Sequence, residues 1–203
     1  MGPLLLVALN TRYLHSSLSL TSLQAFWSRR PDRPPLEILD YDLNQGNETL
    51  INRLILLQPA FIGFSTYIWS VMPILAVAGA LKSALPETCI VLGGPEVSFE
   101  TEPLMQSSPY IDAVVRGEGE FTLEEVLDRF LQGKSWAGCQ GLTHRLGNQV
   151  VSEPDRPWIE SLDALPSPYT TGLYGMGRGF TYYEASRGCP FRCSYCLSSV
   201  LGP

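Results

Sequence analysis

Short apolar runs alternate with longer amphipathic stretches from residue 3 to about residue 132. Runs that are apolar nearly throughout are typical of strands buried on both faces, as in a parallel sheet covered by helices. The pattern predicts five such strands, at residues 3–9, 36–41, 60–65, 89–92 and 111–115.

The stretches between the runs have helical spacing of apolar residues. They predict helices near 17–27, from an N-cap at Asn47 to 57, from about Ser70 to 85 with Pro73 in the first turn, and over 121–131. Five buried strands that alternate with these helices predict an α/β fold with a doubly wound parallel five-stranded sheet, of the flavodoxin or Rossmann kind.

Ligands of this architecture bind outside the carboxyl ends of the strands. We therefore expect a binding site among the loops that follow the strands, at residues 10–15, 65–70, 93–98 and 116–120. The apolar loop residues Tyr67, Ile68, Trp69 and Val71 have two equal interpretations: a wall of the binding cleft, or packing beneath a following domain.

The pattern changes after residue 133. Runs at 142–146 and 149–152 flank Gly147-Asn148, which is a two-residue hairpin signal. Four prolines then interrupt the chain between 154 and 168, and another strand-like run covers 180–186. We predict an α/β domain at 1–135, a hairpin and Pro-rich linker at 136–178, and the start of a second, truncated domain at 179–203.

Charge and hydropathy narrow the class of partner. The net charge is −6, and the basic residues are scattered, with Arg29-Arg30 as the only adjacent pair. A nucleic-acid backbone requires a clustered basic face, so we expect no nucleic-acid partner. No apolar stretch approaches the ~20 residues that cross a bilayer, and no signal peptide is recognisable, so we expect no membrane partner and a cytoplasmic location.

Three of the five cysteines, Cys189, Cys193 and Cys196, lie within eight residues. Thiolates at this spacing can hold one iron–sulfur cluster, and three ligands leave one iron of a four-iron cube open. Zinc and chance are the alternatives. Structural zinc takes four ligands, and no other Cys or His is near unless Cys139 returns to the triplet.

The triplet, with Tyr195 before its last cysteine, resembles the motif of the radical S-adenosylmethionine superfamily. The resemblance implies a 4Fe–4S cluster whose open iron binds S-adenosylmethionine. It also implies that the run at 180–186 is the first strand of a radical-enzyme barrel.

Together with the triplet, the α/β domain resembles the cobalamin-binding half of cobalamin-dependent radical enzymes, and most of all an uncharacterised bacterial branch. The resemblance lies in Ala8-Leu9-Asn10, Gly93-Gly94-Pro95-Glu96-Val97-Ser98 and Arg116-Gly117-Glu118-Gly119-Glu120. The cofactor contacts that it implies are Asn10, Thr11, His15, Ser65, Thr66, Tyr67, Gly93, Gly94, Pro95, Glu96, Gly117, Glu118 and Gly119, with Tyr195 beside the cluster.

Plainer roles stay open for several of these residues. The glycines can form ordinary turns, Ser65 and Thr66 can cap the next segment, and Glu120 can favour a helix N-terminus. Many cobalamin domains carry Asp-x-His-x-x-Gly after the first strand, but here neither that Asp nor that Gly is present. His15 is therefore either a cobalt ligand or, more simply, a cap or core residue.

The resemblance implies a parent enzyme that methylates an unactivated centre of an unknown substrate and takes electrons from a donor such as flavodoxin or ferredoxin. A full barrel needs roughly 200 residues, so we expect this chain to be inactive alone. A cobalamin-binding module without catalysis is the alternative. A nucleotide or flavin binder with a structural metal is disfavoured, because neither a Gly-x-Gly-x-x-Gly after the first strand nor a P-loop occurs.

Overall fold

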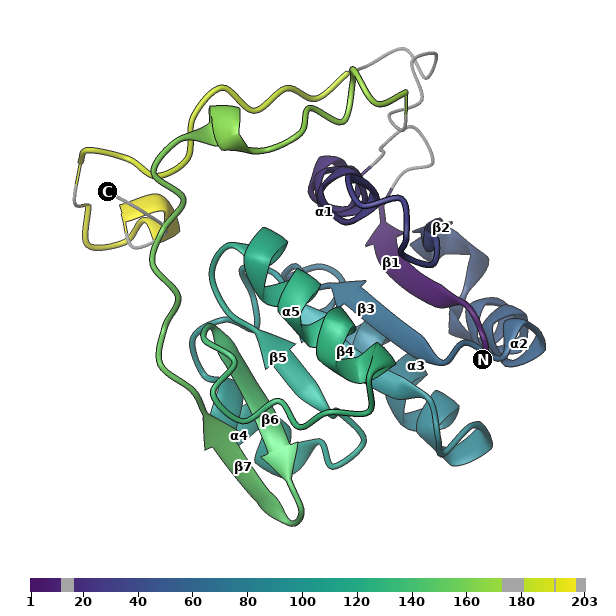
Figure 1. The fold of residues 1–203 in the computed structure, drawn as a ribbon. Helices are drawn as coiled ribbons and strands as arrows, with labels where there is room; N and C mark the ends of the chain where they lie inside the picture. Colours follow the sequence, from purple (N-terminus) through teal and green to yellow (C-terminus); the bar gives the residue numbers. More distant parts are fainter. Residues whose placement is uncertain (12–16, 173–180, 192, 200–203) are drawn as a thin grey trace.

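A mixed seven-stranded sheet, in the order β2-β1-β3-β4-β5-β6-β7, runs through the centre of the protein (Figure 1). The structure is a computed structural model that describes residues 1–11, 17–172, 181–191 and 193–199. The strands are β1 (Leu4–Asn10), β2 (Leu36–Asp42), β3 (Phe61–Ser65), β4 (Cys89–Gly93), β5 (Ala113–Val115), β6 (Leu142–Leu146) and β7 (Gln149–Ser152). Strands β1 to β5 are parallel, which confirms the predicted α/β fold.

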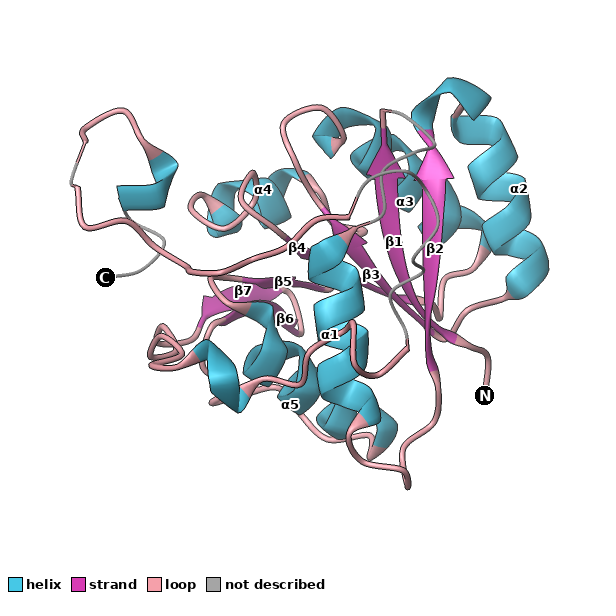
Figure 2. Cartoon of the chain, turned by 90° about the horizontal axis from the view of Figure 1, so that it is seen from above, coloured by secondary structure: helices cyan, strands magenta, loops and turns pink. Residues whose placement is uncertain are grey.

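Helices cover both faces of the sheet (Figure 2). They are α1 (Leu18–Ser28), α2 (Asn47–Leu57), α3 (Val71–Ala84), α4 (Thr101–Ser107) and α5 (Gly119–Leu131), with short 3₁₀ turns at Leu43–Gln45, Leu162–Ala164 and Leu197–Ser199. Alternate side chains of a strand point to opposite faces. Leu5 and Val7 accordingly join a core with α2, α3 and α4, whereas Leu4 and Leu6 join a second core with α1 and α5. No helix in the described part of the chain is long and apolar enough to cross a membrane.

The hairpin, predicted as part of the linker, instead extends the sheet. Strand β6 pairs antiparallel with β5, so that Ala113 lies opposite His144 and Val115 opposite Leu142. Strand β7 then forms the outer edge. The physical reason is that β5 would otherwise end the sheet with a row of unpaired N–H and C=O groups.

Two local predictions were wrong, and one helix was missed. Gly46, with φ of +79°, is the N-cap of α2, and Asn47 is the first residue of the helix. The short helix α4 was not predicted. Residues 181–186 form no strand and pair with none of the sheet, so the predicted first barrel strand is absent from the described residues.

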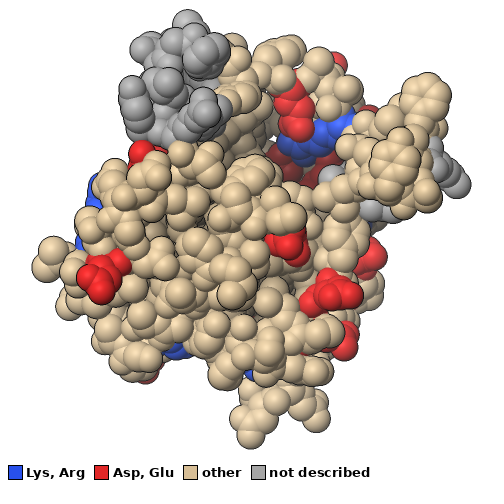
Figure 3. All heavy atoms as spheres, turned by 180° about the vertical axis from the view of Figure 1, so that it is seen from behind, with Lys and Arg blue, Asp and Glu red and all other residues tan. Residues whose placement is uncertain are grey.

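The segment after β7, called the arch below (described residues 153–172 and 181–191), passes over the end of the sheet toward which β1 and β3 point (Figure 1). Among described residues 153–172, the 3₁₀ turn at Leu162–Ala164 is the one regular element, as expected for a Pro-rich linker. The face in Figure 3 has few charged side chains, and basic and acidic atoms gather together in one hollow near the top of the view.

Candidate cofactor-binding site

A cavity of about 1170 Å³ lies at the carboxyl edge of the parallel strands. Pockets for drug-sized ligands measure about 300–1,000 Å³, so this one admits a larger molecule. Its wall is formed by the ends of β1, β3, β4 and β5, the first turns of α1 and α5, and residues 182–188 of the arch. Ten predicted residues line it: Asn10, Thr11, Ser65, Tyr67, Gly93, Gly94, Pro95, Gly117, Glu118 and Gly119.

Three other predicted contacts, Thr66, Glu96 and Tyr195, are not among the cavity residues. Thr66 is fully buried, and its backbone N–H donates to the Gly93 carbonyl at 2.7 Å. Glu96 is not among the cavity residues, and Tyr195 is 91% exposed outside the cavity. His15 lies outside the described residues.

The turn after β4 brings two backbone segments into close contact. Gly94 has φ of +113°, a conformation that side chains disfavour. A Cβ added to Gly94 would lie 2.5 Å from the Thr66 carbonyl oxygen, so no larger residue fits without movement. A Cβ at Gly93 would instead meet Val115 at an ordinary 3.7 Å, so the absence of a side chain there leaves the cavity wall open.

The loop after β5 carries an ion cluster. The Arg187 guanidinium binds Glu118 at 2.9 Å and Glu120 at 2.6 Å, and its Nε donates to Glu184 at 3.0 Å. Burial alone lowers the pKa of Arg187, but the hydrogen bonds and charges of Glu120, Glu118 and Glu184 outweigh it and hold that pKa well above its ordinary value. Arg187 therefore stays charged inside the cavity wall.

Tyr67 and Trp69 bring a pair of stacked aromatic rings to the cavity wall. Their rings stack with centroids 4.7 Å apart and planes 5° apart, and both residues line the cavity. Of the two interpretations of this apolar loop, the structure therefore favours the cleft wall for Tyr67 and Trp69. Ile68 between them is 75% exposed.

Sequence reasoning did not name cavity residues from four places. The start of α1 contributes Ser17 and Ser19, and the linker contributes Trp158. Residues 182–188 precede the cysteine triplet, and Ser98 lies within the expected loop 93–98 but was not named as a contact. The start of α1 could have been predicted as part of the site, because the N-termini of the helices follow the carboxyl ends of parallel strands. Nothing in the Pro-rich segment indicated that Trp158 would reach Gly117.

The cysteine triplet begins next to the cavity. Gly188 lines the cavity and Cys189 follows it; the three cysteines are partly exposed, and the Cys196 N–H donates to the Cys193 carbonyl at 3.1 Å. Three thiolates suit an iron–sulfur cluster chemically. Among the described residues, however, no three Cys, His, Asp or Glu side chains are gathered as metal ligands, so the metal role stays a prediction.

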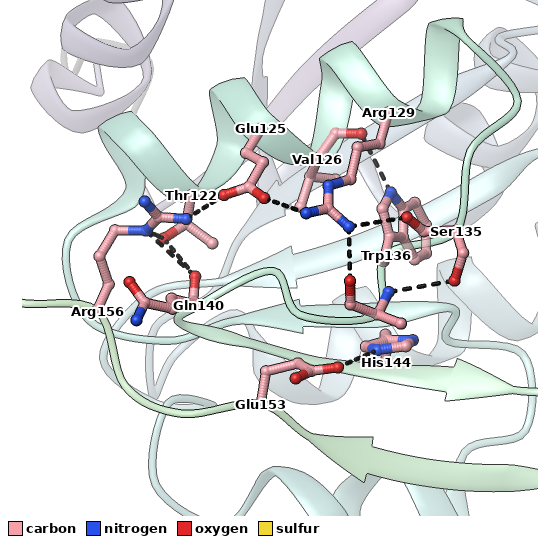
Figure 4. Close-up of polar contacts among 11 residues, drawn as sticks. Thr122, Glu125, Val126, Arg129, Ser135, Trp136, Gln140, His144, Glu153 and Arg156 are labelled. Carbon is pink, nitrogen blue, oxygen red and sulfur yellow. Dashed lines mark hydrogen bonds and ion pairs between the residues drawn. The ribbon is translucent and has the colours of Figure 1, made fainter.

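Cys139 does not return to the triplet. It is fully buried in the core beneath α5, where burial and then the charge of Glu125 raise its pKa to about 12. Figure 4 shows the structural contacts around this region, in which Glu125 lies between Arg129 and Arg156 and the buried His144 contacts Glu153 at 3.1 Å. The zinc alternative with Cys139 as fourth ligand is therefore not supported.

Two methyltransferases are among the proteins whose sequences are similar to this chain. An uncharacterized methyltransferase of Pyrococcus horikoshii is 36% identical over 148 residues, covering 70% of this chain and 32% of that protein. The cobalamin-dependent radical SAM methyltransferase TokK of Streptomyces tokunonensis is 30% identical over 151 residues, covering 70% of this chain and 22% of TokK.

The fold also matches solved structures. The cobalamin-dependent S-adenosylmethionine radical enzyme OxsB, solved with aqua-cobalamin and S-adenosylmethionine bound, has a TM-score of 0.75 at 19% identity, covering 96% of this chain and 28% of OxsB. This chain thus spans a third or less of the length of these proteins. The B12 binding domain model matches residues 5–127, more than half of the chain, which therefore belongs to the B12-binding domain family.

Proposed function

We propose that the cavity at the carboxyl edge binds cobalamin, and that this chain serves as the cobalamin-binding part of a radical S-adenosylmethionine methyltransferase. The observation that carries the proposal is the cavity itself. It exceeds the volume of ordinary ligand pockets, and ten of the cofactor contacts that the family resemblance implies line it within residues 5–127, the span that the family model matches.

The residues of the wall suit a large, flat, amide-bearing ligand. The glycine turn after β4 offers backbone without side chains. The Tyr67–Trp69 stack offers a planar apolar surface. Asn10 and Ser65 offer polar groups that can pair with amides at the ends of β1 and β3.

Cysteines 189, 193 and 196 are the residues that would hold a 4Fe–4S cluster, with Tyr195 beside it. In the proposed parent enzyme, cobalamin supplies a carrier for a methyl group, and the cluster with S-adenosylmethionine supplies radical chemistry. An electron donor such as flavodoxin or ferredoxin, an unknown substrate with an unactivated centre, and a cytoplasmic location belong to the same proposal.

Retention of corrin tests the cavity. Purified chain is incubated with hydroxocobalamin, desalted and measured by absorbance. We expect about one corrin per chain, and roughly tenfold less for Gly93→Val, which places a branched side chain in the cavity wall. Ser83→Val, an exposed change on α3, should retain corrin like the wild type. A wild-type chain that keeps no corrin contradicts the proposal.

Anaerobic reconstitution with iron and sulfide tests the triplet. We expect broad charge-transfer absorbance in the wild type, its loss in Cys193→Ala, and its survival in Cys139→Ala, which changes a core residue only. Retention of zinc alone contradicts the cluster. Retention of corrin without iron supports the alternative, a cobalamin-binding module without catalysis of its own.

A further inference from the structure

Arg187 joins two parts of the chain that are far apart in sequence. It lies in the arch, two residues before Cys189, while Glu118 and Glu120 belong to the loop after β5 and the first turn of α5. The separations are 69 and 67 residues. The contact therefore holds the segment before the cysteine triplet against the carboxyl edge of the sheet, and it must repay the conformational entropy of fixing that segment.

The geometry uses the whole guanidinium group. Each of its three nitrogens donates to a different carboxylate, at 2.6 to 3.0 Å. The Glu120 side chain is 5% exposed and the Glu118 side chain 12% exposed, so both charges are largely removed from water. Carboxylates so placed require a cation, because a buried charge without a partner is strongly unfavourable.

Glu118 also anchors the beginning of the arch. Its second carboxylate oxygen accepts the Ile159 backbone N–H at 2.6 Å. The neighbouring Trp158 ring lies against Gly117, where an added Cβ would come within 3.9 Å of it. One glutamate thus contacts the arch at two points, which are 28 residues apart in sequence, at Ile159 and at Arg187.

We propose that Arg187 is a positioning residue, which fastens the segment that carries the cysteine triplet to the Glu118–Glu120 loop at the cavity. Gly188 lines the cavity, and Cys189 is the next residue in the chain. The positioning itself is argued only from the ion pairs of Arg187 with Glu118 and Glu120 in this chain. What this positioning means for residues that would hold a cluster or a corrin rests on the proposed function.

Carboxyl footprinting of the full chain without cofactors tests the fastening. The chain is treated with a carbodiimide and an amine, and labelling at each glutamate is measured by mass spectrometry. Arg187→Gln should raise labelling of Glu118 and Glu120 by about tenfold. The variant loses the charged hydrogen bonds to both glutamates, and the segment that shields them from solvent is released. Arg29→Gln, which breaks the 2.8 Å pair with Glu124 between α1 and α5, is the matched control and should leave Glu118 and Glu120 unchanged.

A second readout separates movement of the segment from a local change of charge. Arg187→Gln should also speed alkylation of Cys189, while the core residue Cys139 stays unmodified. Arg187→Lys keeps one positive charge but cannot bind three carboxylates at once. Labelling of Glu118 and Glu120 in this variant should therefore fall between that of the wild type and that of Arg187→Gln. Unchanged labelling of Glu118, Glu120 and Cys189 in a folded Arg187→Gln chain overturns the proposal.

The reciprocal experiment covers the case in which Arg187→Gln does not fold. The Glu118→Gln/Glu120→Gln variant removes the charges that need a cation, and phenylglyoxal should then modify Arg187 about tenfold faster than in the wild type. Equal rates in the two proteins overturn the proposal. All these labelling experiments are done without cobalamin. A wild-type chain that retains no corrin would therefore contradict the proposed function and leave the positioning role of Arg187 unaffected.

Discussion

Gly94 connects the chemistry of a single residue to the shape of the cavity. Its positive φ lets the chain turn directly after β4, and its missing side chain lets the backbone lie against Thr66. The same contact sets the Thr66 N–H to donate to the Gly93 carbonyl, which joins the ends of β3 and β4. The floor of the cavity is therefore held by backbone atoms, and side chains are kept out of the space that a ligand would occupy.

We predict that Gly94→Ala lowers the free energy of unfolding by about 2–4 kcal/mol, because it combines backbone strain with a steric clash. Gly133→Ala is the control. Gly133 also has a positive φ, of +62°, but an added Cβ meets nothing within 4 Å. The control should cost only about 1 kcal/mol. Urea unfolding gives both values, and equal losses in the two variants would show that contact with Thr66 is unimportant.

The sequence allowed only part of this site to be predicted. Gly93-Gly94-Pro95 marked the end of a strand, and the rule for carboxyl ends placed it at a binding site. Which glycine is constrained could not be read from the sequence, because the constraint comes from Thr66 on a different strand end. Thr66 itself was expected to contact the cofactor. In the structure it packs against Gly94 and is fully buried.

At the scale of elements, helix α5 is the support to which the loops around β6 and β7 are attached. Glu125 on this helix binds Arg129 one turn later at 2.6 Å and also binds Arg156 from the segment after β7 (Figure 4). Arg129 in turn donates to the carbonyls of Ser135 and Ala137. These contacts hold the connection from α5 to β6 against the helix.

The pKa of Glu125 gives this support a pH dependence. Burial raises that pKa, but the hydrogen bonds of Arg156 and Arg129 lower it more, so that it falls below the ordinary value of 4.5. A lowered pKa in the folded state means that the stabilisation is complete above about pH 4.5 and is lost as the pH falls through the folded-state pKa. Glu125 is partly exposed, so the gain is about 1 kcal/mol or less.

We therefore predict that Glu125→Gln lowers the Tm at pH 7 by about 2–4 °C. The difference from the wild type should shrink as the pH falls below about 4. Thermal unfolding followed by circular dichroism at several pH values measures it. Glu37→Gln, a change at an exposed position of β2, is the control and should follow the wild type throughout. A Glu125→Gln deficit that persists at low pH would mean that packing, and not charge, is responsible.

For the whole molecule, elements were easier to predict than their assembly. The five parallel strands and the hairpin have local patterns of apolar residues and turns, and both were found. The pairing of β6 with β5 was not, because it depends on which edge of the sheet is open. The course of the arch depends on Arg187 and on glutamates almost 70 residues away, and no local pattern records such a contact.

The same pairing makes the domain larger than the segment that the family model matches, which ends at residue 127. Cys139 and Leu142 are fully buried in the core formed with α1 and α5. Arg116, at the end of β5, donates to Thr143 at 2.5 Å and binds Asp155 at 2.9 Å. A chain that ends after α5 loses these contacts and exposes the edge of β5.

We predict that a chain ending at residue 132 aggregates or unfolds at a Tm more than about 10 °C below that of the full chain, since it loses buried apolar side chains and exposes a strand edge. A chain ending at residue 160 keeps the hairpin and the Ile159 contact to Glu118. It lacks Arg187, but it also lacks the segment that buries Glu118 and Glu120, so their charges return to water and the chain should melt within about 5 °C of the full chain. Thermal unfolding and size-exclusion chromatography compare the three. If the shorter chain proves as stable and as monomeric as the longer one, the hairpin is an attachment to the cobalamin-binding fold and no part of its core.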